Sequence, residues 1–373
     1  MAHYVATLCN VIFLLASFAY AQCPNLVAQY QSPNSRTMTS NSTWFILPVR
    51  KSDVQTAIDE TTDPLSKLFR QLRLLVVPEE YQMGSDFHPV LVSAGYMADI
   101  RQSVLQLDRP LTGASVMVPF VGIPKSDTPF IRPITTYIAG SGTDGDRFWA
   151  YLAALVPAKV ATFVGAIPTR VGAFIPENAA YKYDITGPDG PIYSKNSKWA
   201  VFPNLLSGPG IYEETVDMHF ISEPKERYSI KLLKQAINQP YLLNFPLSFR
   251  CQRNTYFFDN ATSKYEFRSG NVTLGPAASA NVLAKTLMKA SPDGVGNYYN
   301  VHGFSGCAQL VGYDTAGGQE CEQAASSPLK GRPWPFEPSL DALWDDHPGA
   351  RIRRTGVVTS ISVGYSHIVT LDA

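Results

Sequence analysis

The sequence predicts a β-rich α+β protein in which a bent antiparallel sheet or barrel carries a few peripheral helices. Many short runs of β-branched and aromatic residues favour strands, and only a few stretches have helical spacing. The 28 prolines interrupt both kinds of element. No internal repeat of about 20 to 50 residues is visible, which argues against a solenoid or a propeller. A hydrophobic content of 45% with only 17% charged residues indicates a large folded core.

The first 21 residues are typical of a secretory signal peptide. An almost unbroken apolar run (11–18) is followed by the small residues of AYA (19–21), so we expect cleavage after Ala21 and secretion. The apolar run is too short to span a bilayer. The rest of the chain is divided into a polar surface arm (22–43), a single β-rich domain (44–323) and a Pro- and charge-rich C-terminal extension that ends in a strand (324–373).

Within the domain, apolar residues at helical spacing mark residues 53–74, where Pro64 predicts a break into two short helices. Residues 148–156, 230–237 and 281–290 are expected helices for the same reason. Runs rich in β-branched and aromatic residues predict strands between them. The expected strands are residues 45–49, 74–77, 90–93, 115–120, 134–138, 160–164, 171–175, 199–202 and 215–221.

The charge balance argues against two classes of partner. Lys plus Arg equals Asp plus Glu, at 31 each, and the leader contains none of these residues. A formally neutral chain is not expected to bind nucleic acid or an anionic membrane surface. No later stretch is long and apolar enough for a membrane-spanning helix. We therefore expect a soluble, exported protein.

Cleavage of the leader removes Cys9 and leaves four of the five cysteines: Cys23, Cys251, Cys307 and Cys321. An even number of cysteines in an exported chain predicts two disulfides, and the sequence alone leaves three pairings open. We favour Cys307–Cys321, which closes the Gly-containing loop between them, together with Cys23–Cys251. No CxxC spacing supports the alternative of a nucleophilic or metal-binding cysteine.

Three sequons predict N-linked glycans on surface segments, at Asn41, Asn260 and Asn271. The last two flank the segment KYEFR (264–268), whose alternation predicts an exposed strand. The region from 254 to 273 is therefore expected to form a solvent-facing hairpin.

The motifs of several enzyme classes are missing from the sequence. No GxGxxG run follows a strand and no phosphate-binding loop ends in GK[ST], which argues against a nucleotide-binding enzyme. No HExxH pair is present, and sequence neighbours such as Asp86 and His88 do not supply the ligands that a metal needs. HGFSG (302–306) resembles a hydrolase elbow, but the second glycine that a Ser305 nucleophile requires would fall at Cys307. We expect a tight turn there, and neither a metal nor a cofactor.

Two segments place a few polar groups among apolar, Gly-containing strands. They are HPVLVSAGYMADIR (88–101) and KVATFVGAIPTRVG (159–172). A concave pocket with sparse orienting groups has this composition. An ordinary sheet with ion pairs at its strand ends has it too, so both interpretations stay open.

Two shorter segments carry a resemblance to a known family. VGAIPTRVG (164–172) resembles the strand and turn that hold the catalytic lysine of the acetoacetate decarboxylase-like family, and NQPYLLNFP (238–246) is similar to a later strand of that family. The resemblance extends over roughly residues 44 to 290 and implies a β-rich cone around a closed apolar cavity. It also implies a buried lysine that forms a Schiff base with a β-keto acid, whose iminium accepts the electrons released as carbon dioxide leaves.

The turn departs from the family, because Thr169 and Arg170 stand where the lysines should be. Arginine stays charged and forms no Schiff base, so Arg170 is expected to anchor a carboxylate, with Tyr96 and Asp99 as polar companions. Lys159 is the candidate catalytic amine if burial lowers its pKa. The alternative is a surface lysine that ends a helix.

Two functions fit these observations. The first is lyase or isomerase chemistry on a small carbonyl- or carboxylate-bearing metabolite in an apolar cavity. The second is a non-catalytic, secreted glycoprotein that binds a ligand or another surface, which the missing lysine, the sequons and the Pro-rich extension favour. A hydrolase that works through Ser305 is a third alternative.

Overall fold

The structure is a computed structural model of the chain. It describes residue 25 and residues 35–62, 71–102, 105–107, 111–140, 147–163, 166–175, 197–204, 214–243, 248–258, 265–313 and 318–326. All described residues belong to the first unit of the chain, residues 1–330. The expected signal peptide, Cys23, Asn260 and the extension beyond residue 326 lie outside the described residues.

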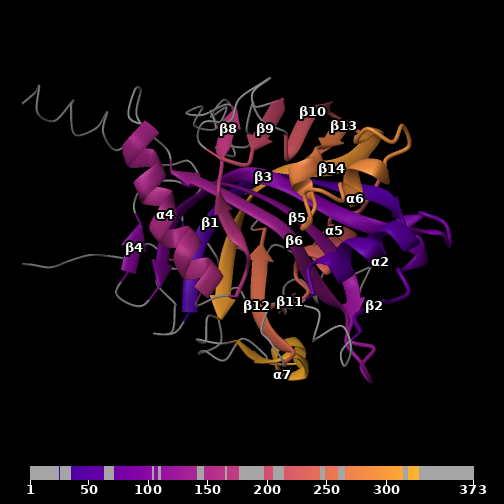
Figure 1. Ribbon diagram of the computed structural model, residues 1–373, viewed down its shortest axis with the longest axis horizontal. Helices are drawn as coiled ribbons and strands as arrows, with labels where there is room; N and C mark the ends of the chain where they lie inside the picture. The colour runs from indigo at the N-terminus through magenta and orange to yellow at the C-terminus, as the bar shows by residue number, and fades with distance from the viewer. Residues whose placement is uncertain are drawn as a thin grey trace, which may run out of the picture. The chain divides into compact units, whose positions relative to one another are not determined.

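The described strands belong to one sheet, shown in Figure 1. They are β1 (Ser35–Arg50), β2 (Arg73–Leu74), β3 (Phe87–Gln102), β4 (Leu105–Leu107), β5 (Leu111–Gly122), β6 (Phe130–Gly140), β7 (Thr169–Val171), β8 (Ala173–Ile175), β9 (Lys198–Phe202), β10 (Val216–Ser222), β11 (Tyr241–Leu242), β12 (Arg250–Phe257), β13 (Tyr265–Leu274), β14 (Asn297–Tyr313) and β15 (Gln319–Glu320).

Short helices accompany this sheet, so the predicted β-rich α+β class is confirmed. The α-helices are α2 (Lys51–Glu60), α4 (Arg147–Phe163), α5 (Ile230–Ile237), α6 (Thr286–Lys289) and α7 (Cys321–Ser326), and the 3-10 helices are η3 (Glu79–Tyr81) and η4 (Pro276–Ala278). None of the helices that the structure describes has the length and hydropathy of a membrane-spanning segment.

The strand pairings close into a circuit. Neighbouring strands pair antiparallel, apart from short parallel pairings of β6 with β7 and with β11. Only Gly172 separates β7 from β8, and its N–H donates to the carbonyl of Ile138 on β6 at 2.9 Å. From β8 the pairings run through β9, β10, β13, β14, β1, β3 and β5 back to β6. The sheet is therefore a bent barrel with an inner and an outer face.

Alternation along β1 shows how the sequence builds the two faces. Phe45 and Leu47 join the inner core, whereas Trp44 and Ile46 join a separate outer core. The inner core takes a large apolar side chain from each of nine strands of the circuit: Phe45, Val92, Val116, Tyr137, Phe174, Trp199, Phe220, Val272 and Val301.

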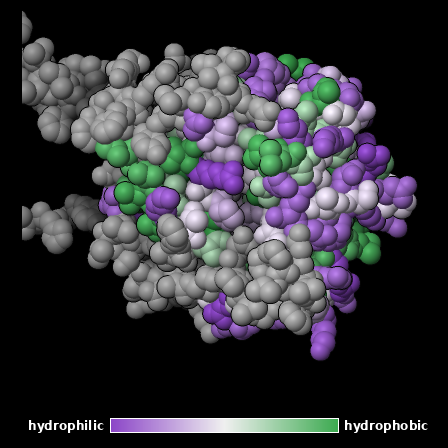
Figure 2. All heavy atoms as spheres, viewed as in Figure 1, coloured by the Kyte–Doolittle hydropathy of each residue, from purple (hydrophilic) through white to green (hydrophobic). Residues whose placement is uncertain are grey.

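The helices cover the barrel at different places. In the outer core, Leu233 and Ile237 of α5 pack with Tyr81 of η3. Buried residues of α2 belong instead to the inner core, and α2 lies beside α6 (Figure 1). Helix α4 packs on β6 and turns Val156 (67% exposed) and Val160 (44% exposed) outward. Figure 2 shows apolar residues gathered at the position of α4.

The first strand begins earlier than the sequence predicts. The sequence places residues 35–43 in the surface arm, but they form the first part of β1, and residues 37–43 are buried. Their polar composition favours a surface position. Threonine is nevertheless a good strand former, and strands β3 and β14 pair with this stretch on both sides.

Two other elements differ from expectation. The predicted strand 160–164 falls largely within α4, which continues through Pro157 while Ala154 and Ala158 pack against Ile138. The predicted hairpin from 254 to 273 is wrong. Strands β12 and β13 do not pair with each other in the sheet; they lie one after the other along the same edge of β14, at residues 309–313 and 297–306.

A disulfide joins Cys251 on β12 to Cys321 at the start of α7. This bond contradicts the predicted pairing of Cys307 with Cys321 and of Cys23 with Cys251. The reason is topological, because β15 pairs with β12 and places Gln319 opposite Cys251, only two residues before Cys321. Cys307, on the inner face of β14, is disulfide-bonded as well.

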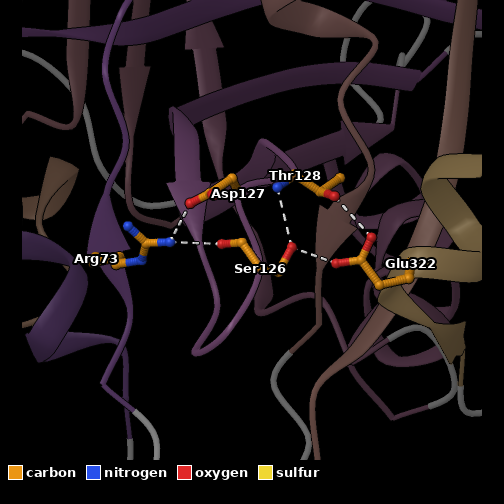
Figure 3. A network of polar contacts seen from close by, with 5 residues as sticks. All are labelled: Arg73, Ser126, Asp127, Thr128 and Glu322. Carbon is orange, nitrogen blue, oxygen red and sulfur yellow. Dashed lines mark hydrogen bonds and ion pairs between the residues drawn. The ribbon is translucent and has the colours of Figure 1, made fainter.

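A polar network next to this disulfide joins three parts of the chain, as Figure 3 shows. Glu322 of α7 accepts hydrogen bonds from the hydroxyls of Ser126 and Thr128, the latter at 2.7 Å, in the loop between β5 and β6. Arg73 of β2 donates to the carbonyl of Ser126 at 2.8 Å and to the carboxylate of Asp127 at 2.6 Å. The disulfide therefore anchors the start of α7, and α7 in turn is hydrogen-bonded through Glu322 to the loop between β5 and β6.

Candidate functional site

A chain of polar side chains crosses the inner face of the barrel. Thr43 on β1 is the register partner of Ser305 on β14, which is the partner of Glu266 on β13. Arg268 lies two residues beyond Glu266, on the same face. We call these four residues and Asn41, two residues before Thr43, the inner polar group.

Hydrogen bonds connect four members of the inner polar group. The hydroxyls of Thr43 and Ser305 are 2.8 Å apart, and Arg268 Nε donates to Ser305 Oγ at 3.0 Å. Arg268 Nη2 lies 2.7 Å from Glu266 Oε2. The guanidinium carbon of Arg268 is 5.5 Å from the centre of the Phe220 ring, which the inner core also contains.

Asn41 is the member whose hydrogen bonding is incomplete. Its residue is only 6% exposed, and its Nδ2 finds no hydrogen-bond partner among the described residues. The register places Asn41 between Tyr96 on β3 and Cys307 on β14, facing the barrel interior. Buried donors are rarely left without an acceptor, so this one marks a place where an acceptor from elsewhere would be stabilised.

The burial of Asn41 argues against the glycan predicted there, because a folded chain leaves no room for a sugar on that side chain. Asn271, by contrast, is exposed, at an irregularity in the pairing of β13 with β14. A glycan at Asn271 stays a prediction.

Aromatic side chains border the inner polar group. Tyr96 is buried next to Asn41, and its ring meets that of Trp199 on β9 edge to face, with 5.3 Å between ring centroids. Burial raises the pKa of the Tyr96 phenol, so this hydroxyl keeps its proton at neutral pH. The interior thus combines hydrogen-bonding groups with flat apolar surfaces.

The structure does not bring the four predicted site residues into one enclosed group. Tyr96 is buried on the inner face, as expected. Arg170 pairs with Tyr137 on β6, but its side chain is exposed. Lys159 is exposed on α4, outside the barrel, and Asp99 accepts a hydrogen bond from Arg101 at 2.7 Å near the end of β3. An exposed Arg170 does not provide the buried carboxylate anchor that the sequence suggested.

Ser305 lies within β14 and not in the predicted tight turn. Its hydroxyl contacts Thr43 and Arg268. Neither partner can take a proton from a serine, since one is a hydroxyl and the other is a guanidinium. His302, three residues away, faces the other side of the strand and contacts Glu223 at 2.9 Å. These contacts do not activate Ser305 as a nucleophile.

Sequence reasoning missed Arg268 and Glu266 because their segment was interpreted as an exposed strand. The sequence did contain a pattern that indicates the inward position of Asn41 and Thr43. Asn41 and Thr43 continue the alternation of Phe45 and Leu47, so a strand that began earlier would have placed them on the same inner face. No pattern in the sequence could have placed Arg268 beside Ser305, because that depends on the register of β13 with β14.

The described residues also limit two kinds of chemistry. None of the described lysines is buried, so none has the desolvated surroundings expected of a Schiff-base amine. Within the described ranges, no three His, Cys, Asp or Glu side chains lie together as a metal site requires.

Comparisons with known proteins found similarity in structure alone. No family model matches the chain, and no curated protein matches its sequence. An acetoacetate decarboxylase-like enzyme from Sphingomonas wittichii RW1 is similar over 77% of this chain and 93% of its own, with a TM-score of 0.43 and 8% identity. An enduracididine biosynthesis enzyme, solved with a condensation product of pyruvate and imidazole 4-carboxaldehyde, covers 76% of this chain and 88% of its own, with a TM-score of 0.40 and 10% identity. The first of these carries the name of the family that the two segments 164–172 and 238–246 resemble.

Proposed function

We propose that this protein binds a small molecule with a carbonyl or carboxylate group inside the barrel, at the inner polar group. The unpartnered Nδ2 of buried Asn41 is the observation that carries the proposal. A carbonyl or carboxylate oxygen is the acceptor that this donor lacks. The rings of Tyr96, Trp199 and Phe220 suit the apolar body of such a ligand.

The remaining polar contacts support binding rather than turnover. Ser305 is held between Thr43 and Arg268, so its hydroxyl has a fixed position but no base. The interior thus has groups that orient a ligand, and the described residues add no amine that would attack a carbonyl. The non-catalytic binding protein is therefore the form of the proposal that we favour over lyase chemistry.

The binding proposal is tested with Asn41→Ala and, as a matched control, Ser40→Ala. Ser40 is the neighbouring residue on β1, buried and hydrogen-bonded to Ser42, but it faces the outer side. Titrations of acetophenone, benzamide and benzoate followed by ligand-observed NMR should show roughly tenfold weaker binding of the preferred probe to Asn41→Ala than to Ser40→Ala. Equal affinities of the two variants would contradict the proposal.

The lyase alternative has its own test. Incubation with a β-keto acid and borohydride should leave the mass of the protein unchanged, because the described lysines, Lys159 included, are not buried. A mass increase located at Lys159 would support amine chemistry in place of simple binding.

We further propose that the protein is secreted, with residues 1–21 as its signal peptide. The apolar run before Ala21 and the disulfide between Cys251 and Cys321 support this, since such bonds persist in oxidising compartments. Expression with the leader should give a product in the medium whose first residue is Gln22. Retention inside the cell with an intact leader would contradict it.

A further inference from the structure

We infer that Glu266 sets the charge preference of the inner polar group, so that it takes uncharged carbonyl compounds such as ketones, aldehydes and amides in preference to carboxylates. This inference rests on the binding function proposed above and narrows its ligand class. It makes Glu266 a specificity-determining residue.

Few charged side chains are buried in the described part of the chain. Among the described histidines, lysines, arginines, aspartates and glutamates, three are buried: His88, Arg132 and Arg268. His88 contacts the carbonyl of Pro119, and Arg132 is bound to Thr61 at the end of α2. Arg268 is therefore the buried cation of the inner polar group.

Arg268 already has a counter-charge in Glu266. The Glu266 carboxylate lies 2.7 Å from Arg268 Nη2, and the two side chains are 22% and 8% exposed. At that distance, and with so little solvent, the pair presents almost no net charge to a ligand. Arg170 shares the face of Tyr137, but it is exposed, so solvent screens its charge.

A carboxylate and an amide of the same shape differ in the hydration that each loses on entering the barrel. A carboxylate loses its hydration on entering and meets attraction from Arg268 together with repulsion from Glu266, so the lost hydration is not recovered. An amide or ketone loses much less hydration, and its oxygen still accepts from Asn41 Nδ2. Because Glu266 is the register partner of Ser305, the two residues lie one strand spacing apart and on the same inner face of the barrel.

The experiment measures the affinity ratio of two isosteric pairs, benzamide with benzoate and butanamide with butanoate, at neutral pH. The wild-type chain should bind each amide at least about tenfold more tightly than its carboxylate. Glu266→Gln keeps the side-chain shape and removes the charge, so the ratio should fall by about tenfold or reverse, through a gain in carboxylate affinity. Glu320→Gln is the matched control, since Glu320 also pairs with an arginine, Arg250 at 2.6 Å, but outside the barrel. It should leave the ratio unchanged.

Several outcomes would overturn the inference, and they differ from a failure of the proposed function. A wild-type chain that binds benzoate as well as benzamide, or a Glu266→Gln ratio equal to that of Glu320→Gln, contradicts the charge preference while binding in the barrel stands. Binding of no probe at all contradicts both. If Glu266→Gln does not fold, Glu266→Asp is the second variant: it retains the charge and must retain the preference for amides. The amide-to-carboxylate affinity ratio of the wild-type chain also tests the charge preference without any variant.

Discussion

Arg132 holds Thr61 with two of its donor groups, Nε to the hydroxyl at 2.8 Å and Nη2 to the backbone carbonyl at 2.9 Å. Thr61 ends helix α2, and Arg132 lies buried on β6. Nη1 reaches the carbonyls of Leu242 and Leu243 at 3.3 and 3.5 Å. One guanidinium thus ties α2 and β11 to the barrel. Burial lowers the pKa of Arg132 to about 10, so the group remains charged at neutral pH.

Replacing this arginine should destabilise the fold strongly. Arg132→Met keeps the apolar length but leaves the buried carbonyl oxygen of Leu242 and the partly buried oxygens of Thr61 without donors, so the free energy of unfolding should fall by about 3 kcal/mol or more. Urea denaturation at neutral pH measures it. Arg73→Met is the control, because Arg73 pairs with Asp127 at the surface and its loss should cost less than about 1 kcal/mol. Equal losses for the two variants would contradict the role given to Arg132.

His88 makes stability depend on pH. Its Nε2 lies 2.7 Å from the carbonyl of Pro119, and burial, with a smaller contribution from Lys51, lowers its pKa to about 4. A folded-state pKa below the unfolded value of 6.5 means that the unfolded chain binds the proton first. Stability is therefore complete above about pH 6.5 and is lost as the pH falls from there to about 4, by about 3 kcal/mol in total.

The variant His88→Gln isolates this contribution from that of the carboxylates, because glutamine can still donate to the Pro119 carbonyl but does not titrate. Unfolding free energies of both proteins between pH 7 and pH 4 should converge as the pH falls. Parallel curves would show that His88 does not titrate in this window.

The outline of the fold could be predicted from sequence, whereas the inner polar group could not. Strand-forming runs such as 115–120 and 134–138 identified β5 and β6 because their side chains favour strands wherever they pair. Arg268, Ser305 and Thr43 come together through the register of three strands that are distant in sequence, and no local pattern encodes that register. The charges of Glu266 and Arg268 also led to a wrong prediction. Charged residues in a strand favour a solvent-facing position, but these two form an ion pair with each other on the inner face.

The disulfide between Cys251 and Cys321 should contribute a large share of stability. It closes a separation of 70 residues, which in the chain-entropy view is worth about 4 kcal/mol. A double variant, Cys251→Ser with Cys321→Ser, should lose most of this in urea denaturation. It should also loosen α7. Backbone amides near Ser126 and Thr128 should therefore exchange faster than in the wild-type protein, whereas exchange in β13 should not change. Unchanged exchange in that loop would show that Glu322 holds it without help from the disulfide.

The buried sequon at Asn41 and the exposed sequon at Asn271 should differ in glycosylation. Asn41 is 6% exposed in the barrel, whereas Asn271 is exposed where the pairing of β13 with β14 is irregular, and its Oδ1 accepts from the N–H of Asn300 at 3.2 Å. In a secreting eukaryotic host, Asn271→Gln should remove one glycan from the secreted protein, and Asn41→Gln should remove none. Intact-mass measurement before and after enzymatic removal of N-glycans checks both. A glycan on Asn41 of the folded, secreted protein would place that side chain outside and end its assignment to the inner polar group, because a residue cannot carry a sugar in solvent and present its amide to the barrel interior.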